Sequence, residues 1–336
     1  MKKLALICMV LLLVGVSFGV CPSADLTGDC KVNLADFAVF ASQWLTEGIP
    51  GLDGMVFVTI PAGTFDMGDS FSEGSSGELP VHTVTLSSFK MSKYEITNAQ
   101  YAEFLNSAYP EQIKVVSGFI YAVSDTDNSY LYCDTSARIP YSQIDFSGGV
   151  FTVRIKGGRD ISNDPIVNVT WYGAKAFCDY YDYKLPTEAQ WEYAARGGLA
   201  DKRFPWGDAI NHDHANYMAD GSNYTYDTSP YSDYTFHPTW NDGILPYTSP
   251  VGSFAANGYG LYDMTGNVCE WCSDWYGGYS PDSQINPTGS TIEGTRVIRG
   301  GSWYGLAYFC RVAYRISNHP FYRDYSIGFR VCLDQN

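Results

Sequence analysis

The sequence contains little positive charge and few charged residues of any kind. Lys and Arg total 21 against 36 Asp and Glu, so the formal net charge is −15, and charged residues make up 17% of the chain. This composition argues against nucleic-acid binding, because phosphates need Lys and Arg partners. The acidic balance is compatible with calcium binding, and the 45% hydrophobic content predicts that most of the chain folds.

Several catalytic patterns are also missing. The sequence has no G-x-S-x-G turn, phosphate-binding glycine loop or zinc-finger spacing. His212 and His214 form a close pair among the five histidines, but alternate loop positions do not make a metal site without further ligands. Aromatic residues are abundant, at 16% with 27 Tyr, and such a surface often contacts sugars or peptides. It is equally compatible with aromatic residues in the core.

Long hydrophobic runs are absent except at the N-terminus. Lys2 and Lys3 precede an apolar run over 4–20, which ends in the small-x-small pattern of residues 17–19. This pattern predicts a cleaved signal peptide over residues 1–19; the alternatives are a membrane anchor and a lipoprotein with Cys21 as its first residue. We expect a secreted, periplasmic or cell-surface protein with no stable membrane span after cleavage.

Export changes how the cysteines are interpreted. Of nine cysteines, Cys8 leaves with the signal, so an even number remain in a compartment where disulfides persist. The Cys269-x-x-Cys272 spacing is therefore less typical of a cytosolic redox pair.

Residues 21–46 resemble a single dockerin repeat. Oxygen-bearing side chains fall at loop positions 1, 3, 5, 9 and 12, as a calcium loop requires: Asp25, Thr27, Asp29, Asn33 and Asp36. An amphipathic helix follows. Cys30 replaces the usual turn glycine, there is no second repeat, and the alternative is a solvated helix start. A Gly/Pro linker over 47–54 separates this segment from the rest of the chain.

The remaining residues, 55–336, predict an α+β domain with little regular structure. Alternating patterns over 55–68 and 82–97 indicate strands, and Thr97 with Gln100 forms a capping box for a helix. Residues 110–163 indicate an insertion or long hairpin region. Two helices are expected within 169–198, capped by Thr170 and Thr187, followed by mostly loop over 199–290 and by strands near the C-terminus.

The same region contains seven stretches in a characteristic order: PAGTFDMG (61–68), KYEITNAQYAEFLN (93–106), PIVNVTWYGAKAFCDYYDYKLPTEAQWEYAARGG (165–198), FPWGD (204–208), NGYGLYDMTGNVCEWCSDWY (257–276), RVIRGGSW (296–303) and NHPFYRDYSIGFRV (318–331). Through these stretches the region resembles the formylglycine-generating enzyme family, also called sulfatase-modifying factors. This resemblance implies a variant of the C-type lectin fold.

Two calcium sites follow from the resemblance. The first would use Asn216, the Tyr217 carbonyl, Asp242 and the Ile244 carbonyl. The second would use Asp263, the Gly266 and Val268 carbonyls, and Glu270. Carboxylate, amide and carbonyl oxygens suit this hard cation, whereas the alternative is an ordinary Asx-rich turn.

The resemblance also implies a reaction, the oxidation of a sulfatase cysteine to formylglycine with copper and O₂. Two thiolates hold the copper, as suits a soft ion. Gly305 stands where the first cysteine belongs, and Cys310 stands at the second. Ser302 and Cys269 are the other candidate catalytic residues, with Cys269 in place of a tryptophan near the family's active site.

Two disulfides are implied in the same way, Cys272–Cys310 and Cys178–Cys332, with Cys133 and Cys269 unassigned. The first would remove the remaining copper thiolate.

The main hypothesis is a divergent, exported, calcium-stabilised domain that binds a peptide, protein or glycan. The alternative is an active oxidase that uses copper and has sulfatases as partners. A third hypothesis is a surface assembly component that docks through residues 21–46.

Overall fold

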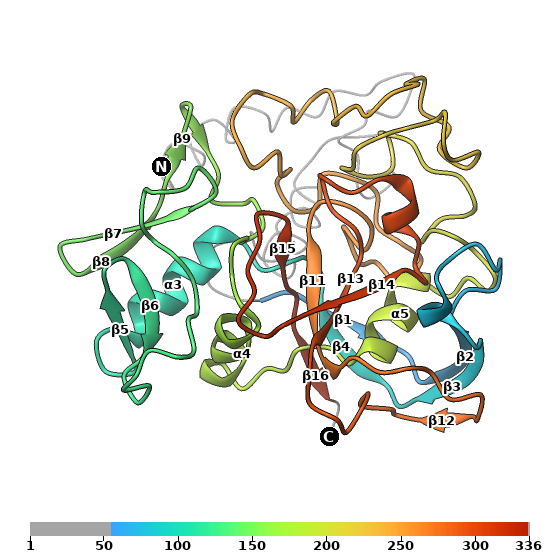
Figure 1. Ribbon diagram of the computed structural model, residues 1–336, viewed down its shortest axis with the longest axis horizontal. Helices are drawn as coiled ribbons and strands as arrows, with labels where there is room; N and C mark the ends of the chain where they lie inside the picture. The colour runs from blue at the N-terminus through green and yellow to red at the C-terminus, as the bar shows by residue number, and fades with distance from the viewer. Residues whose placement is uncertain (1–54, 335–336) are drawn as a thin grey trace, which may run out of the picture. The chain divides into compact units, whose positions relative to one another are not determined.

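The computed structural model describes residues 55–334 (Figure 1). The predicted signal peptide, the linker and the dockerin-like segment lie outside these residues. So do the five predicted calcium ligands of that segment: Asp25, Thr27, Asp29, Asn33 and Asp36. Within the described part of the chain, no helix has the length and apolar character needed to cross a membrane.

A four-stranded sheet carries the segments of greatest interest. Its strand order is β14 (Arg315–Asn318), β13 (Arg296–Arg299), β11 (Cys269–Trp275) and β15 (Ile327–Gly328). β13 pairs antiparallel with both neighbours, whereas β15 runs parallel to β11. The strands near the C-terminus are therefore confirmed, and they lie beside the cysteine-containing stretch that begins at Cys269.

Two three-stranded sheets are built mostly from the N-terminal half of the domain. One has the order β1 (Phe57–Ile60), β4 (Phe89–Ser92) and β16 (Cys332–Asp334); the other has β12 (Gln284–Ile285), β3 (His82–Leu86) and β2 (Gly63–Met67). The predicted strands over 55–68 and 82–97 are confirmed. Strands adjacent in sequence join different sheets, because β1 pairs with β4 and β2 pairs with β3.

The region 110–163 consists largely of hairpins, as predicted. They are β5 (Ile113–Val116) with β6 (Phe119–Ala122), β7 (Ile144–Ser147) with β8 (Val150–Val153), and β9 (Ile155–Lys156) with β10 (Arg159–Asp160). Each turn has two consecutive residues with positive φ, such as Gly148 and Gly149. Such turns match the twist of the flanking strands, which explains the closely spaced glycines.

Three helices begin at the predicted caps. α3 (Asn98–Ala108) and α5 (Glu188–Arg196) each start with a Thr–Gln capping box, and α4 (Trp171–Tyr180) starts at Thr170. Gly197 ends α5 in the left-handed conformation, at φ 58°. Two short 3₁₀ helices, η1 (Ser76–Glu78) and η2 (Ala307–Cys310), complete the helical elements of residues 55–334.

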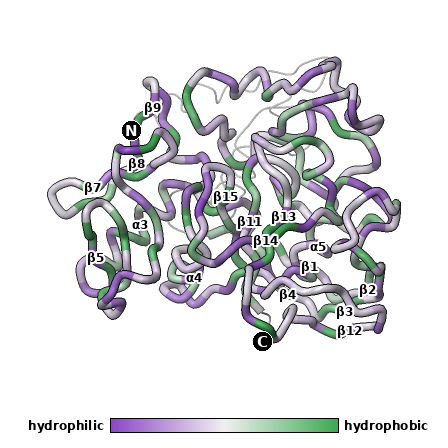
Figure 2. Tube along the Cα trace, viewed as in Figure 1, coloured by the Kyte–Doolittle hydropathy of each residue, from purple (hydrophilic) through white to green (hydrophobic). Residues whose placement is uncertain are grey.

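Buried carboxylates hold much of the irregular chain between α5 and β11. Asp227 accepts hydrogen bonds from the Tyr217 hydroxyl at 2.7 Å and from the backbone nitrogens of Asp220 and Ser229. The carboxylate thereby accepts from backbone N–H groups that have no hydrogen-bond partner in a helix or sheet. Figure 2 shows hydrophobic and hydrophilic segments alternating over short distances along the described trace, as expected for short elements and frequent loops.

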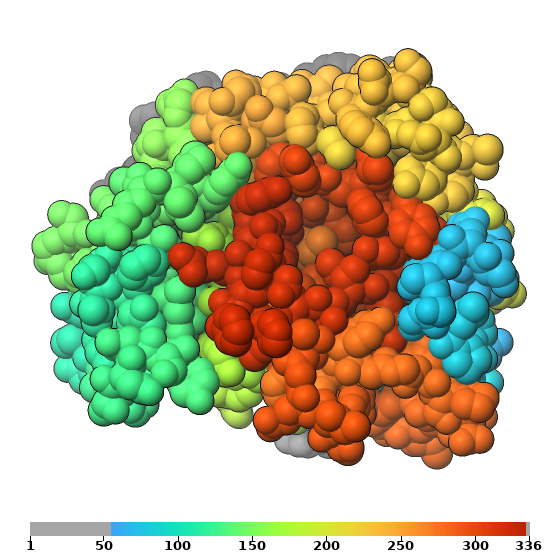
Figure 3. Space-filling view, viewed as in Figure 1, coloured from blue at the N-terminus to red at the C-terminus, as the bar shows by residue number. Residues whose placement is uncertain are grey.

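Arginine–glutamate pairs lie inside the core of the domain. Arg330 pairs with Glu270, Arg299 with Glu192 and Arg311 with Glu78, and all six side chains are almost completely buried. Each pair joins segments far apart in sequence. On the face drawn in Figure 3, the red C-terminal segments lie between the green and blue parts of the chain.

Candidate functional site

The loop after β13 forms the centre of the site that the sequence predicts. Gly300 and Gly301 have φ values of 101° and 71°, which favour glycine. A β-carbon at Gly301 would lie only 2.7 Å from the Cys310 sulfur. These glycines therefore let the Cys310 thiol rest against the backbone that leads into Ser302.

Cys310 is buried at the end of η2, with 1% of its surface exposed. The backbone N–H of Ser302 points to the Cys310 sulfur, whereas the N–H of Gly266 donates to the Gly300 carbonyl at 2.9 Å. Burial, reinforced by Cys269 and Asp227, nevertheless raises the pKa of Cys310 well above its usual range. Cys310 is thus a protonated thiol at neutral pH, whereas metal binding and nucleophilic attack need the thiolate.

Cys269 is the second thiol beside Ser302. Its backbone nitrogen donates to the Ser326 carbonyl at 2.8 Å, and its side chain forms a hydrogen bond with the side chain of Ser302. Removal from water raises the pKa of Cys269 to about 12, although part of its surface remains exposed. The structure therefore brings all three candidate catalytic residues together, since both cysteines contact Ser302.

Gly305 belongs to the same loop, and its nitrogen donates to the Ser302 carbonyl at 2.8 Å. Its φ is not in the left-handed region that favours glycine. A β-carbon there would lie 3.3 Å from the Ser302 nitrogen and 3.5 Å from the Phe309 β-carbon. A small shift would admit a side chain, so the backbone does not require glycine at this position. One thiol at Cys310 does not fit the two-thiolate copper site that the resemblance implies.

The second predicted calcium loop presents one open carboxylate oxygen. Asp263 Oδ2 accepts the Gly252 N–H at 2.6 Å, while the buried Oδ1 has no partner among the described residues. Burial raises the pKa of Asp263 to about 6, with Glu270 adding to the shift. An unpartnered buried oxygen is what a missing cation would leave behind.

Glu270, in contrast, is occupied by protein groups. Its carboxylate accepts hydrogen bonds from Arg330 at 2.7–2.9 Å and from Trp191 Nε1 at 2.7 Å. These contacts use the acceptor positions of a carboxylate. The structure therefore leaves an unpartnered oxygen on Asp263 but none on Glu270, and no described cluster of three or more His, Cys, Asp or Glu side chains is arranged to bind a metal.

Glu95 is a buried neighbour that the sequence analysis missed. Its carboxylate accepts the Val268 N–H at 3.2 Å and the Asn267 amide at 2.7 Å. Burial and the charges of Asp263 and Glu270 raise the pKa of Glu95 well above its usual range. The one available signal was an acidic residue inside the strand-like stretch KYEIT, at 93–97.

The residues of the first predicted calcium site form other contacts. Asn216 is buried and donates to the Tyr247 carbonyl at 2.8 Å, and the Tyr217 carbonyl faces His212 Nε2 at 3.1 Å. Asp242 is exposed; it accepts the Ile244 N–H and lies 3.6 Å from Arg159. In residues 55–334, no hydrogen bond joins Asn216 to Asp242.

The two predicted disulfides require correction, because neither is formed in the structure. Cys272 and Cys310 are free thiols that pack in different hydrophobic clusters, Cys272 with Leu261 and Cys310 with Ala307. Cys178 is also a free thiol, so it is not bonded to Cys332. Backbone hydrogen bonds through Tyr183 and Lys184 bring the Cys178 and Cys332 segments close together without a covalent link.

Comparisons with known proteins identify the family and agree with this fold. Residues 50–335 match the Sulfatase-modifying factor enzyme 1-like domain. The formylglycine-generating enzyme of Streptomyces coelicolor is 37% identical, covering 82% of this chain and 88% of that protein. The mouse formylglycine-generating enzyme is 35% identical, with coverages of 86% and 78%. The bovine inactive C-alpha-formylglycine-generating enzyme 2 is 29% identical, with coverages of 88% and 93%.

Solved structures show the same fold at lower identity. Treponema denticola variable protein 1 has a TM-score of 0.58 and 22% identity, covering 86% of this chain and 98% of its own. PvdO from Pseudomonas aeruginosa has a TM-score of 0.56 and 24% identity, covering 86% and 100%. The matched family domain and the relatives above 30% identity show that this chain belongs to the formylglycine-generating enzyme (sulfatase-modifying factor) family.

Proposed function

We propose that this protein is an exported, calcium-stabilised family member that binds a peptide, protein or glycan and does not generate formylglycine. Gly305 carries the proposal, because it leaves Cys310 without its partner in the two-cysteine pattern. The N-terminal signal pattern supports export, and the open Asp263 oxygen supports calcium.

The protonation of the remaining thiols supports the same conclusion. Burial keeps both Cys269 and Cys310 uncharged near neutral pH, whereas a soft metal is held by thiolates. One bovine relative is named an inactive C-alpha-formylglycine-generating enzyme, so at least one protein similar to this chain is not assigned formylglycine-generating activity. We therefore favour retention of the scaffold for binding.

One observation favours the alternative of an active oxidase that acts on a sulfatase cysteine. Cys269 and Cys310 both hydrogen-bond to Ser302, so a second thiol does lie at the site, although it comes from β11 rather than from position 305. An active enzyme would have to use this different pair of thiols.

The deciding experiment is an oxidation assay with a peptide that contains the sulfatase cysteine motif. The full chain is incubated with the peptide, Cu(I) and O₂, and the product is measured by mass spectrometry. The Streptomyces coelicolor enzyme serves as the positive control. We expect unmodified peptide from this protein, and formylglycine product would overturn the proposal.

A further inference from the structure

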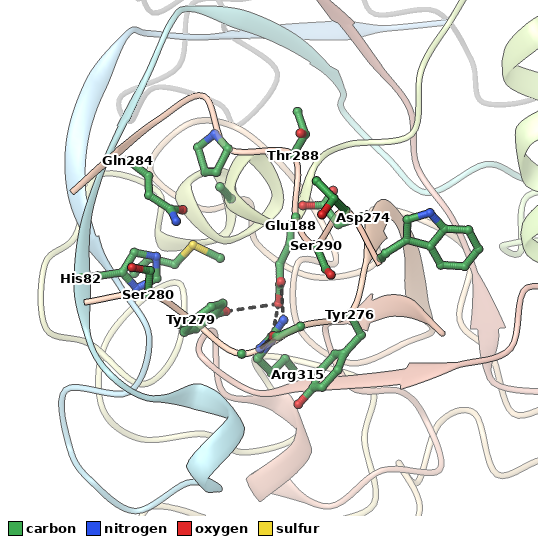
Figure 4. A pocket seen from close by; sticks show the side chains of 18 of the residues that line it. His82, Glu188, Asp274, Tyr276, Tyr279, Ser280, Gln284, Thr288, Ser290 and Arg315 are labelled. Carbon is green, nitrogen blue, oxygen red and sulfur yellow. Dashed lines mark hydrogen bonds and ion pairs between the residues drawn. The ribbon is translucent and has the colours of Figure 1, made fainter. Parts of the chain in front are cut away.

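A cavity of about 780 Å³ lies away from the Ser302 loop (Figure 4). It is bounded by the start of α5, the end of β11, β14, β3 and the loop that contains β12. None of Cys269, Ser302, Gly305 or Cys310 lines it. This cavity is therefore a second place where the domain could hold a ligand.

The fixed charges of the cavity are neutralised internally. Glu188 accepts two hydrogen bonds from Arg315, at 2.6 and 2.7 Å, and one from the Tyr279 hydroxyl at 3.2 Å (Figure 4). The third guanidinium nitrogen of Arg315 donates to the carbonyls of Gly77 and Gly277. Glu188 neutralises the charge of Arg315, and four of the five guanidinium N–H groups already have acceptors, so this pair offers little to an anionic ligand.

Asp274 and His82 also line the cavity. Asp274 accepts the Ser273 hydroxyl, and burial with the nearby Glu188 raises the pKa of Asp274 to about 7. His82 Nδ1 lies 3.1 Å from the Pro80 carbonyl, which makes Nδ1 the donor and leaves Nε2 as an acceptor. Both groups can therefore exchange hydrogen bonds with a neutral molecule.

Other lining side chains have unused hydrogen-bonding capacity. No hydrogen bond in the described part of the chain involves the side chains of Gln284 or Thr288, and both line the cavity (Figure 4). Ile285 and Ile292 also line it and are 77% and 78% exposed. The cavity thus combines neutral donors and acceptors with exposed apolar surface.

We propose that this cavity binds a neutral saccharide. A sugar offers hydroxyl groups around its edge and apolar C–H surfaces on its faces, and the lining offers matching groups for both. Internal neutralisation of Arg315 disfavours an anionic ligand, as does the net charge of −15. The inference rests on the proposed binding function and specifies its ligand class.

The test uses the folded full chain and saturation-transfer NMR. The probes are glucose, galactose, mannose, N-acetylglucosamine and cellobiose, with glucuronate, glucosamine and an uncharged tripeptide as comparisons. Gln284→Ala and Thr288→Val remove one side-chain group each, and Gln112→Ala is the matched control at an exposed position outside the cavity. Thermal unfolding verifies that all variants fold.

We expect at least one neutral sugar to bind, with each cavity variant weakening its affinity about fivefold, the effect of one lost hydrogen bond, and the control leaving it unchanged. Absence of neutral-sugar binding, preference for a charged probe or the tripeptide, or equal binding by the cavity variants would overturn the inference. Formylglycine formation in the separate peptide assay would overturn the noncatalytic proposal while leaving a positive sugar result intact.

Discussion

The Ser302 loop and the cavity beside β12 use their polar groups in opposite ways. At the loop, both thiols are held against protein atoms and kept protonated. In the cavity, Gln284 and Thr288 retain hydrogen-bonding capacity. The difference is consistent with the proposed noncatalytic role of the Ser302 loop and with the proposed binding role of the cavity.

A buried Glu–Arg pair lies near each region, and the two pairs differ in their surroundings. Glu270 and Arg330 are completely buried near the carboxylates of Asp263 and Glu95. Glu188 has a second arginine, Arg299, at 3.7 Å and also accepts from Tyr279, whereas the further donor to Glu270 is the neutral Trp191 indole. Loss of Arg330 near the Ser302 loop should therefore lower the free energy of unfolding more than loss of Arg315 in the cavity.

The largest expected effect comes from Arg330→Met. It leaves the Glu270 charge buried beside other carboxylates, so we expect a loss of about 3–5 kcal/mol in the free energy of unfolding. Arg315→Met should cost less, because Glu188 keeps its other contacts. Urea unfolding of both variants measures the difference. Adding Glu270→Gln to Arg330→Met should recover stability, and a greater cost for Arg315→Met would contradict the comparison.

Gly305→Cys should restore a thiol pair beside Cys310 and increase Cu(I) affinity at least ~10-fold, because two thiolates bind a soft ion better than one. Competition with a chromogenic Cu(I) chelator measures the affinity. Gly305→Ser is the control, since it adds similar volume without sulfur. If the unmodified protein binds Cu(I) as tightly as Gly305→Cys, another residue already supplies the second ligand. Loss of this Cu(I) binding in Cys269→Ser would identify Cys269 as that ligand.

Calcium should raise the melting temperature by about 2 °C, as expected for ~1 kcal/mol of stabilisation in a domain that spans residues 55–334. EDTA should reverse the shift, as followed by circular dichroism. Asp263→Asn tolerates the positive φ of 54° but removes the charge, so it should reduce the response. A melting curve unaffected by both calcium and EDTA would argue against the proposed site.

The last prediction concerns pH and the cavity. The folded pKa of Asp274 is raised to about 7, so its neutral form favours folding and this contribution falls as pH rises from the unfolded value of about 4 through 7. Asp274→Asn should therefore lessen the decline in unfolding free energy over this range, by part of the ~1.4 kcal/mol per pH unit that one proton can contribute. Chemical denaturation at several pH values measures the slopes, and parallel profiles would exclude this role.

Local sequence patterns predicted the parts of the fold that depend on neighbouring residues. The Thr97 and Thr187 capping boxes and the Gly197 terminus were all found at the expected positions. These features act within one helical turn, so the sequence contains the interacting groups next to one another. Local patterns did not predict that β1 pairs with β4 rather than with β2, because this pairing joins segments separated along the chain.

The candidate site could be predicted only in part. Cys269, Ser302 and Cys310 were identified as candidates, and the structure brings them together. The predicted Cys272–Cys310 bond was wrong for this structure, because the two thiols occupy different hydrophobic clusters. Glu95 was missed because its role depends on Asn267, which lies 172 residues away.

The sequence by itself determined the family, the helix boundaries and the loss of one cysteine at Gly305. These properties follow from residue identity, motif order and local backbone chemistry. Only the tertiary structure decided which carboxylates remain available, which thiols face Ser302, and that Glu188, Asp274, Gln284 and Arg315 line one cavity. Burial and competing partners set those properties, and both arise from contacts between segments distant in the chain.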